Sequence, residues 1–312
     1  MKYLKHKDID KQKWDKCISS AQNGLIYAYS WYLDLVAENW DAIVNEDYTQ
    51  VFPLVFNKKM GIKYLYTPPF VQQLGLFSQT KLVDNEVVKY IDIINLFFKY
   101  GDINLNIENI INVNNKYNLT QNFTYHLNLC NKIANIKKNY SENIKRNIKK
   151  AIKNEISIIQ NISPESIISI FKENKGIKLK NINDKHYFLL RKIIYICLSS
   201  GYAKVLGALT KKNELCAGAF FLESHNKSIL LFSGVNEIGR KVGAMSYLID
   251  EYISNIYGNI QILDFEGSND PNLARFYKSF GSVLKTYSRI SINNYPIFIK
   301  PLISMYKYFK LK

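Results

Sequence analysis

The predicted order of secondary-structure elements in the first half of the chain returns in the second half. Each half reads as a helix, three strands joined by short turns, a second helix, a strand, a short helical segment and a last strand. The matching segments are 30–40, 42–47, 51–57, 62–67, 85–100, 103–107, 109–117 and 122–129 in the first half, and 185–200, 203–210, 216–224, 228–234, 243–257, 260–267, 273–280 and 286–292 in the second. Residue identity between the halves is low, so the argument rests on the order and length of the elements. It predicts a duplicated α/β domain, each copy with a mixed sheet buried between helices.

A change in composition indicates where the second copy begins. Residues 136–153 carry seven basic residues and one acidic residue, and their apolar residues recur every fourth position from Ile144. Ser141 is placed to cap the N-terminus of this amphipathic helix. We therefore expect a domain junction near residues 131–136, with one domain at 1–135 and a second at 136–312.

The chain is strongly basic. It has 42 Lys and Arg residues against 26 Asp and Glu residues, a formal net charge of +16. This excess favours an anionic partner such as a nucleic acid, a phosphate-bearing molecule or an acidic membrane face. The alternative explanation for the excess of basic residues is a general bias of the coding sequence toward Asn, Ile and Lys codons.

The four cysteines and four histidines are scattered along the chain, which predicts neither a metal site nor a disulfide framework. The first residues contain no apolar core of signal-peptide length. No window approaches the ~20 apolar residues of a membrane span. We expect a soluble, cytoplasmic protein with reduced thiols.

A glycine-containing segment follows the strand that ends near Ser233. Glycines allow close approach of the backbone to a ligand, and free amides at a helix N-terminus together with cations hold phosphate groups. The alternative is an ordinary strand-to-helix connection with a solvated basic pair. The candidate residues for binding a cofactor-like anionic donor are Gly234, Val235, Gly239, Arg240, Lys241, Gly243 and Ala244.

The strand at 260–267 ends in two carboxylates, Asp264 and Glu266. Two residues apart on a strand, they are expected on the same face. A carboxylate pair at a strand end can orient and deprotonate an amine, so both are candidate catalytic residues. The alternative is structural: an ion pair for Asp264 with a nearby arginine, and a turn-capping role for Glu266. Tyr277, on the next helix, is either a third candidate or a core tyrosine.

Two further places could contact a substrate. In "YTPPFVQQLG", Tyr66 and the amides of Gln72 and Gln73 follow a strand, and the two prolines stiffen the loop. The alternative is a rigid connector. Lys145 and Arg146 lie on the basic helix, which is either an anion-binding face or simply a solvated one. The basic, aromatic C-terminal segment 298–312 is either an ordinary terminal helix or a contact with an anionic membrane.

Taken together, these stretches resemble the GNAT acetyltransferase fold. In that family a Q/R-x-x-G-x-G/A segment grips the pyrophosphate of acyl-CoA, and Arg240 and Gly243 match its Arg and first Gly. The later A-x-x-F-Y-x-x-x-G pattern is matched from Ala274 to Gly281. By this resemblance Tyr277 would be the general acid toward the leaving group.

The tandem arrangement looks more like the FemABX-type aminoacyltransferases and their FemAB-like relatives. The likeness is carried by "YSENIKRNIKKAIKN", "PPFVQQLGLFS" and "LDFEGSNDPNLARFYKSFG" and covers nearly the whole chain. It implies two tandem GNAT-like domains, an acceptor side in 1–135 and a donor side in 136–312.

The implied activity is transfer of an acyl or aminoacyl group, with no metal, from acyl-CoA or aminoacyl-tRNA to an amine. The acceptor would be a cell-envelope peptide or amino-sugar precursor, for example a nucleotide-sugar or peptidoglycan-type molecule. Met245 and Ser282 depart from the family pattern. They leave open a non-catalytic RNA-binding or anionic-lipid-binding protein on the same scaffold.

Overall fold

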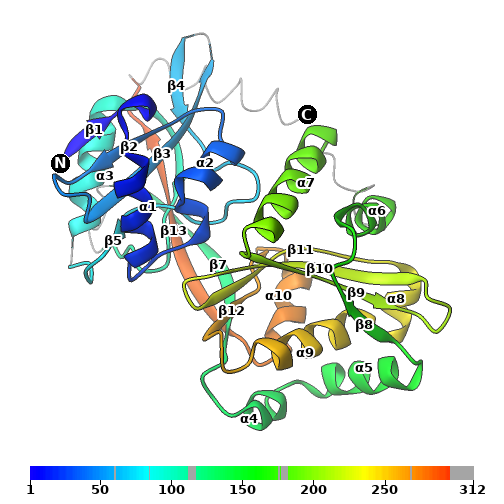
Figure 1. The fold of residues 1–312 in the computed structure, drawn as a ribbon. Coiled ribbons are helices and arrows are strands. Elements are labelled where there is room, and N and C mark those ends of the chain that lie inside the picture. The colour runs from blue at the N-terminus through cyan, green and yellow to red at the C-terminus, as the bar shows by residue number, and fades with distance from the viewer. Residues whose placement is uncertain are drawn as a thin grey trace. The chain divides into compact units, whose positions relative to one another are not determined.

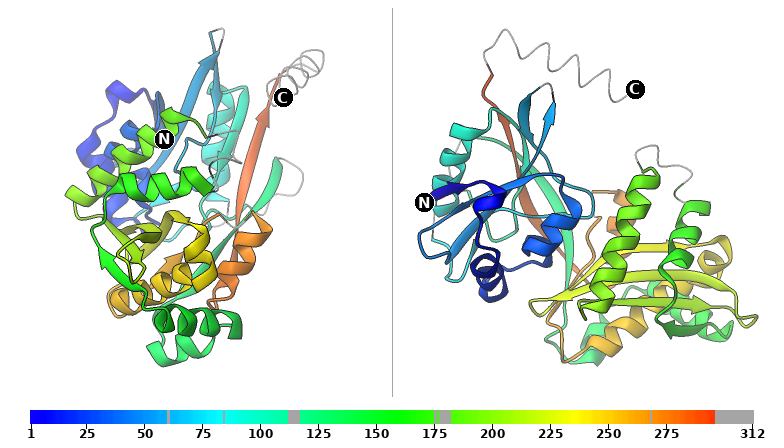
Figure 2. Two further views of the ribbon diagram at one scale, coloured as in Figure 1. Left: turned by 90° about the vertical axis from the view of Figure 1, so that its right-hand side faces the viewer. Right: turned by 45° about the horizontal axis from the view of Figure 1, so that its top comes forward.

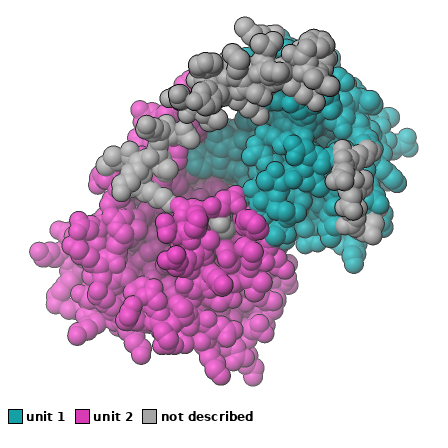
Figure 3. Space-filling view, turned by 180° about the vertical axis from the view of Figure 1, so that it is seen from behind, with its two compact units in different colours: residues 1–122, 286–312 teal, residues 123–285 magenta. Residues whose placement is uncertain are grey.

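The computed structural model describes residues 1–59, 61–83, 85–111, 117–174, 176, 182–267 and 269–295. The chain forms two compact units (Figure 3). Unit 1 comprises residues 1–122 and 286–312, and unit 2 comprises residues 123–285. The C-terminal segment 298–312, for which we predicted a helix or a membrane contact, lies outside the described residues.

Unit 1 is built on a sheet in the order β1-β2-β3-β4-β6-β13, with β5 paired to β3. Only β4 and β6 run parallel, and they meet at a single pair, Leu65 and Gly101. Gly101 has φ +134°, and a β-carbon there would collide with the Leu65 backbone, so this close approach requires glycine. The elements are β1 (Lys2–Leu4), η1 (His6–Asp8), α1 (Lys11–Ser20), η2 (Ile26–Ala28), α2 (Ser30–Val36), β2 (Trp40–Val44), β3 (Gln50–Lys59), β4 (Ile62–Leu65), β5 (Phe77–Ser78), α3 (Glu86–Phe97), β6 (Tyr100–Asn104) and the later part of β13 (Val283–Asn293).

Unit 2 has a sheet in the order β7-β12-β11-β10-β9-β8, in which only β11 and β12 run parallel. Its elements are β7 (Asn118–Asn128), which begins in unit 1, α4 (Ile133–Lys138), α5 (Glu142–Lys153), β8 (Ser157–Gln160), α6 (Pro164–Asn174), α7 (Asp184–Ser199), β9 (Ala203–Leu209), β10 (Leu215–Ser224), β11 (Lys227–Val235), α8 (Glu237–Val242), α9 (Ala244–Ile256), β12 (Ile262–Asp264) and α10 (Pro271–Lys278).

Helices cover both faces of the unit 2 sheet. Figure 1 shows α6 and α7 on one face and α9 with α5 on the other, and the two views in Figure 2 show the same layers. Helix α9 packs on β9 and β10 and carries α5 on its outer side. Its buried face joins the aromatic core formed by Phe221, Phe265 and Phe280. The predicted mixed α/β class with two like-folded domains is confirmed.

The two units exchange their last strands. Each unit has an antiparallel meander (β2-β3-β4 or β9-β10-β11), a helix, and a strand parallel to the last meander strand. In chain order β7 follows β6, but β7 pairs with β12. Likewise β13 follows β12 but pairs with β6. For this reason the compact units divide the chain inside β7 and β13 rather than at the expected junction near residues 131–136.

The basic helix begins as its sequence predicts. The Ser141 side chain accepts a hydrogen bond from the Ile144 backbone N–H. The predicted apolar stripe is wrong at its far end: Ile152 is 56% exposed, and Ala151 is buried instead. Each α-helical residue turns by about 100°, so a spacing of four drifts by about 40° per step, whereas a spacing of seven returns to within about 20° of Ile144.

Candidate functional site

The parallel strands β11 and β12 separate partway along unit 2. They pair only from Lys227 to Ile229, opposite Ile262 to Asp264. Strand β12 then ends, while β11 continues to Val235, so the later half of β11 has no partner on that side (Figure 1). Ligands favour such partings at the carboxyl ends of parallel strands. The candidate site is therefore the carboxyl end of β12.

A buried carboxylate occupies this strand end. Asp264 is 6% exposed and accepts a short hydrogen bond from the Thr124 hydroxyl. His126 Nε2 lies 3.0 Å from Asp264 Oδ2, and the Glu266 backbone N–H donates to Oδ1 at 3.0 Å. Thr124 and His126 lie on β7, the strand that unit 2 receives by exchange. Among the described residues no arginine pairs with Asp264, in contrast to the predicted structural alternative.

The Asp264 carboxylate selects one tautomer of a neutral His126. A carboxylate only accepts, so in the neutral imidazole Nε2 carries the hydrogen and Nδ1 keeps a free lone pair. Within the described residues Nδ1 has no hydrogen-bond partner. A carboxylate that holds an imidazole in one tautomer, with the other nitrogen unoccupied, is the arrangement of a general base.

Glu266 follows Asp264 closely along the chain, whereas Tyr277 belongs to the core on the α9 side of the sheet, opposite the His126–Asp264 pair. Strand β12 ends at Asp264, and Glu266 has φ +47°, so the predicted same-face arrangement of the two carboxylates does not hold. Tyr277, 6% exposed, stacks on Phe265 with ring centroids 4.9 Å apart. Burial, followed by the charges of Glu266 and Asp270, raises the pKa of the Tyr277 phenol. Its hydroxyl therefore stays protonated throughout the neutral range.

The predicted glycine loop is largely helical and tightly packed. Residues 237–242 form α8, and Gly239 and Ala244 are buried. A β-carbon on Gly239 would collide with the Cys216 carbonyl oxygen. One on Gly243 (φ +79°) would lie 2.6 Å from the Asn147 carbonyl oxygen of α5. These glycines allow close packing of protein against protein.

The flanking residues of this segment also have protein partners. A β-carbon on Gly234 would lie 3.1 Å from the Phe171 backbone nitrogen, so this glycine is packed under α6; Val235 follows at the end of β11. Arg240 donates to the Val235 carbonyl at 3.0 Å, and Lys241 pairs with Glu237 at 2.7 Å. The predicted open basic cradle is therefore absent from this described segment.

The predicted substrate contacts in unit 1 are mainly structural. Gln73 is 4% exposed, accepts from the Ile107 N–H at 3.0 Å and donates to the Gln72 side chain at 2.7 Å. This matches the rigid-connector alternative. Tyr66 is half-buried and lines a small hollow where β4 and β6 separate, together with Asn104.

The two predicted residues of the basic helix point away from the core of unit 2. Lys145 pairs with Glu142 at 2.9 Å, and Arg146 donates to the Asn143 side chain at 2.8 Å. Both lie on the solvent side of α5, whereas Tyr66, Gln72 and Gln73 belong to unit 1. The described structure thus keeps Glu266 next to Asp264, packs Tyr277 in the core as the alternative expected, and leaves the other predicted groups apart from the pair.

Sequence reasoning missed Thr124 and His126. The sequence did contain an indication of their role. Thr124 and His126 are two residues apart on an alternating strand, which places both on the buried face of that strand. Buried polar groups need partners, which points to a polar residue on a neighbouring strand. The strand order that makes Asp264 this partner is not readable from local pattern.

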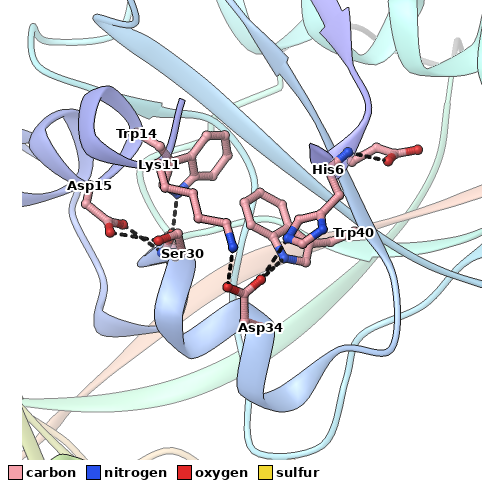
Figure 4. Close-up of polar contacts among 9 residues, drawn as sticks. His6, Lys11, Trp14, Asp15, Ser30, Asp34 and Trp40 are labelled. Atoms are coloured by element: carbon pink, nitrogen blue, oxygen red, sulfur yellow. Dashed lines mark hydrogen bonds and ion pairs between the residues drawn. The ribbon is translucent and has the colours of Figure 1, made fainter. Parts of the chain in front are cut away.

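A second missed polar cluster lies in unit 1 (Figure 4). The Asp34 carboxylate accepts from Lys11 at 2.6 Å, from Trp40 Nε1 at 2.9 Å, and faces His6 Nε2 at 2.9 Å. Burial opposes the charge of Asp34, but these donors outweigh it and lower its pKa. The carboxylate is fully engaged and joins η1, α1 and β2, so we interpret this cluster as structural.

Two features are absent from the described residues: a metal-binding group and a membrane-spanning helix. These residues contain no group of three or more His, Cys, Asp or Glu side chains placed to hold a metal ion. They also contain no helix that is both long and apolar enough to cross a membrane.

Comparison with known proteins gives a fold but no sequence relative. No protein-family model and no curated protein matches the chain. Among solved structures, FemX aligns over 98% of this chain and 99% of its own, with a TM-score of 0.65 and 12% identity. The C-terminal domain of a provisionally assigned lysylphosphatidylglycerol synthetase from Agrobacterium fabrum aligns over 91% and 92%, with a TM-score of 0.53 and 7% identity. L-PGS from Bacillus licheniformis aligns over 85% and 88%, with a TM-score of 0.51 and 8% identity. The chain therefore has the tandem mixed α/β fold of FemX and the FemAB-like GNAT proteins.

Proposed function

We propose that this protein transfers an acyl or aminoacyl group to an amine, and that the reaction takes place at the carboxyl end of β12. The observation that carries the proposal is the buried pair of Asp264 and His126 where β11 and β12 separate. The fold supports the class, because FemX and L-PGS share it. The site supports the chemistry, because amide formation from an amine requires a base.

In this proposal each side chain has a defined task. His126 Nδ1 takes a proton from the attacking amine, and Asp264 orients the ring and stabilises the imidazolium that forms. The amine nitrogen bonds to the acyl carbon, and the bond from that carbon to the donor's sulfur or oxygen breaks. The His126 imidazolium then gives its proton to the leaving group, because Tyr277 is packed in the core on the other side of the sheet. Glu266 attracts the incoming ammonium form of the acceptor.

The donor is either acyl-CoA or an aminoacyl-tRNA, as expected from the sequence resemblance. Both are polyanions, which suits a chain of net charge +16. The packed glycines show that a phosphate would have to be held outside the Gly239–Ala244 segment. Amide N–H groups at the open edge of β11 beyond Ile229 are the nearest candidates in the parting. The acceptor we propose is an amine on a cell-envelope precursor, or an aminoacyl-accepting anionic lipid.

A donor screen by mass spectrometry tests the proposal. Acyl-CoAs and charged tRNAs are offered against nucleotide-sugar, peptide and lipid acceptors. With an active pair, His126→Gln should lower kcat by about 10²–10⁴, the range for loss of a general base. Asp264→Asn should lower it comparably, whereas Tyr277→Phe, on the other side of the sheet, should leave kcat nearly unchanged. His225→Gln, in the β10–β11 turn, is the matched control. Full activity of His126→Gln, with its fold intact by circular dichroism, would contradict the assignment.

A second function, anion binding without catalysis, is favoured by one observation. The side-chain ammonium groups of Lys149, Lys150 and Lys153 on α5 have no hydrogen bond or ion pair within the described residues. Binding of RNA or of anionic vesicles, measured at low and high salt, separates the two functions. An electrostatic binder loses affinity steeply with salt and shows no saturation by an acyl donor.

A further inference from the structure

A hollow in unit 2 lies away from the His126–Asp264 pair. It encloses about 430 Å³ and lies between the first residues of β9, the last residues of β10 and the C-terminal end of α9. This volume is within the range of small-molecule sites. Its walls include Lys204, Glu223 and Tyr252.

The hollow and the His126–Asp264 pair face opposite sides of the sheet. Tyr252 of α9 contacts Ser228 of β11, with 2.5 Å between the hydroxyl oxygens, so Ser228 faces α9. Asp264 is aligned with Ile229, the next residue along β11. Successive side chains on a strand alternate between faces, so Asp264 lies on the other side. The hollow is therefore a separate site.

One wall of the hollow carries a carboxylate that is held in position. The Tyr252 hydroxyl donates to Glu223 Oε1 at 2.8 Å. Tyr252 itself is 1% exposed and stacks on Phe221, with ring centroids 3.5 Å apart and planes 13° apart. The fixed phenol therefore orients Glu223 and leaves its second oxygen available.

A positive charge, the ammonium group of Lys204, lines the same hollow. Lys204 lies on β9, opposite Phe221 of β10, two residues before Glu223. Within the described residues Lys204 makes no hydrogen bond or ion pair, and it does not come within ion-pair distance of Glu223. The hollow thus presents a cation and an anion that are separated by space rather than joined to each other.

The rest of the lining suits a ligand with both polar and apolar parts. Gln160, Asn255 and Asn259 present amide groups, and Ile256 and Leu206 supply apolar surface. Amides donate and accept, so they match a polar backbone, while the apolar residues match a side chain.

We propose that this hollow binds a zwitterionic small molecule of the α-amino-acid class, as the free amino acid or as a short peptide. The ligand ammonium bonds to Glu223, its carboxylate bonds to Lys204, and its side chain lies against Ile256. Charge-assisted hydrogen bonds at both ends supply the specificity. The site is independent of the proposed transfer reaction.

The test is calorimetric titration of the full chain, with no acyl donor present. The probes are L-alanine, L-isoleucine and L-alanyl-L-alanine, each against two blocked analogues. N-acetyl-L-alanine lacks the ammonium group, and L-alaninamide lacks the carboxylate. We expect binding of at least one zwitterion and at least about tenfold weaker binding of both analogues. A preference for the dipeptide over the amino acids identifies a peptide site.

Variants connect the binding to the two charges. Lys204→Met should weaken binding of the zwitterion but leave L-alaninamide unaffected, because that probe has no carboxylate to lose. Glu223→Gln should show the converse with N-acetyl-L-alanine. Lys211→Met, which removes an exposed cation paired with Glu155 at 2.8 Å, is the control and should bind as the wild type does. No heat for any zwitterion at millimolar concentration, or equal binding by wild type and Lys204→Met, overturns the proposal. Transferase activity of Lys204→Met is unaffected either way.

Discussion

Replacing Gly243 by alanine separates a packing glycine from a phosphate-binding one. Gly243 ends α8 and precedes α9, with φ +79° and ψ 22°. In this left-handed region a side chain costs roughly 1–2 kcal/mol. The added β-carbon would also lie 2.6 Å from the carbonyl oxygen and 2.9 Å from the β-carbon of Asn147. The first of these is a backbone atom of α5, so no flexible side chain can move aside.

The magnitude follows from adding the two effects. Overpacking a well-packed region costs typically about 1–3 kcal/mol. We therefore expect Gly243→Ala to lower the free energy of unfolding of unit 2 by about 2–5 kcal/mol. Gly258→Ala is the matched control, because Gly258 has φ +85° but nothing within 4 Å of its added β-carbon. That variant should lose only the backbone contribution of roughly 1–2 kcal/mol.

Urea unfolding followed by far-UV circular dichroism measures both variants. All three tryptophans lie in the first 40 residues, so tryptophan fluorescence reports on unit 1 and locates the damage. Equal destabilisation by the two substitutions would refute the steric argument. A Gly243→Ala protein as stable as Gly258→Ala, but with lost donor binding, would instead favour the phosphate-binding interpretation.

Three further predictions concern charge and capping. Asp34→Asn keeps an acceptor for Trp40 but removes the charge, and because the cluster is partly exposed it should lower stability by about 1 kcal/mol at pH 7. Since the folded pKa of Asp34 is lowered, the advantage of the wild type should disappear as the pH falls below about 4. Urea midpoints measured over an acid titration check this. The raised pKa of Tyr277, like that of the buried Tyr90, Tyr140 and Tyr252, predicts that stability falls as the pH rises above about 10, because the phenol ionises more readily in the unfolded chain. Tyr277→Phe should reduce the late absorbance change at 295 nm by the share of one tyrosine among 23. Ser141→Ala removes the cap of α5 and should cost about 1 kcal/mol in thermal or urea unfolding, whereas Ser141→Asp should retain it.

Several features could be read from local sequence because local geometry determines them. The Ser141 cap depends on groups within three residues of each other and forms as predicted, and the Asp270 cap at the start of α10 is equally local. The duplicated order of elements also follows from periodicity within each segment. The glycines of the 234–244 segment were harder to interpret. A glycine that allows a ligand to approach and one that allows a helix to approach look identical in sequence.

The candidate site also could be predicted only in part from local sequence. Asp264 could be named from its place at a strand end, whereas Tyr277 is a core residue on the other side of the sheet. His126 could not be named in this way, because its role depends on the partner strand, 138 residues away. The hollow between Lys204 and Glu223 depends on the position of α9 over two strands, and no sequence motif predicts that position.

The sequence by itself determined most of the helices and strands and the order in which the main ones recur, because hydrophobic period and capping act over a few residues. The short helix expected at 109–117 is not seen in the described part of that segment. The tertiary structure alone decided that the last strands are exchanged and that β7 brings His126 to Asp264. Backbone hydrogen bonds between strands are alike for every sequence, so the choice of neighbour depends on side-chain packing across the whole sheet. A pair of functional residues on two neighbouring strands can therefore be recognised only when the order of the strands is known.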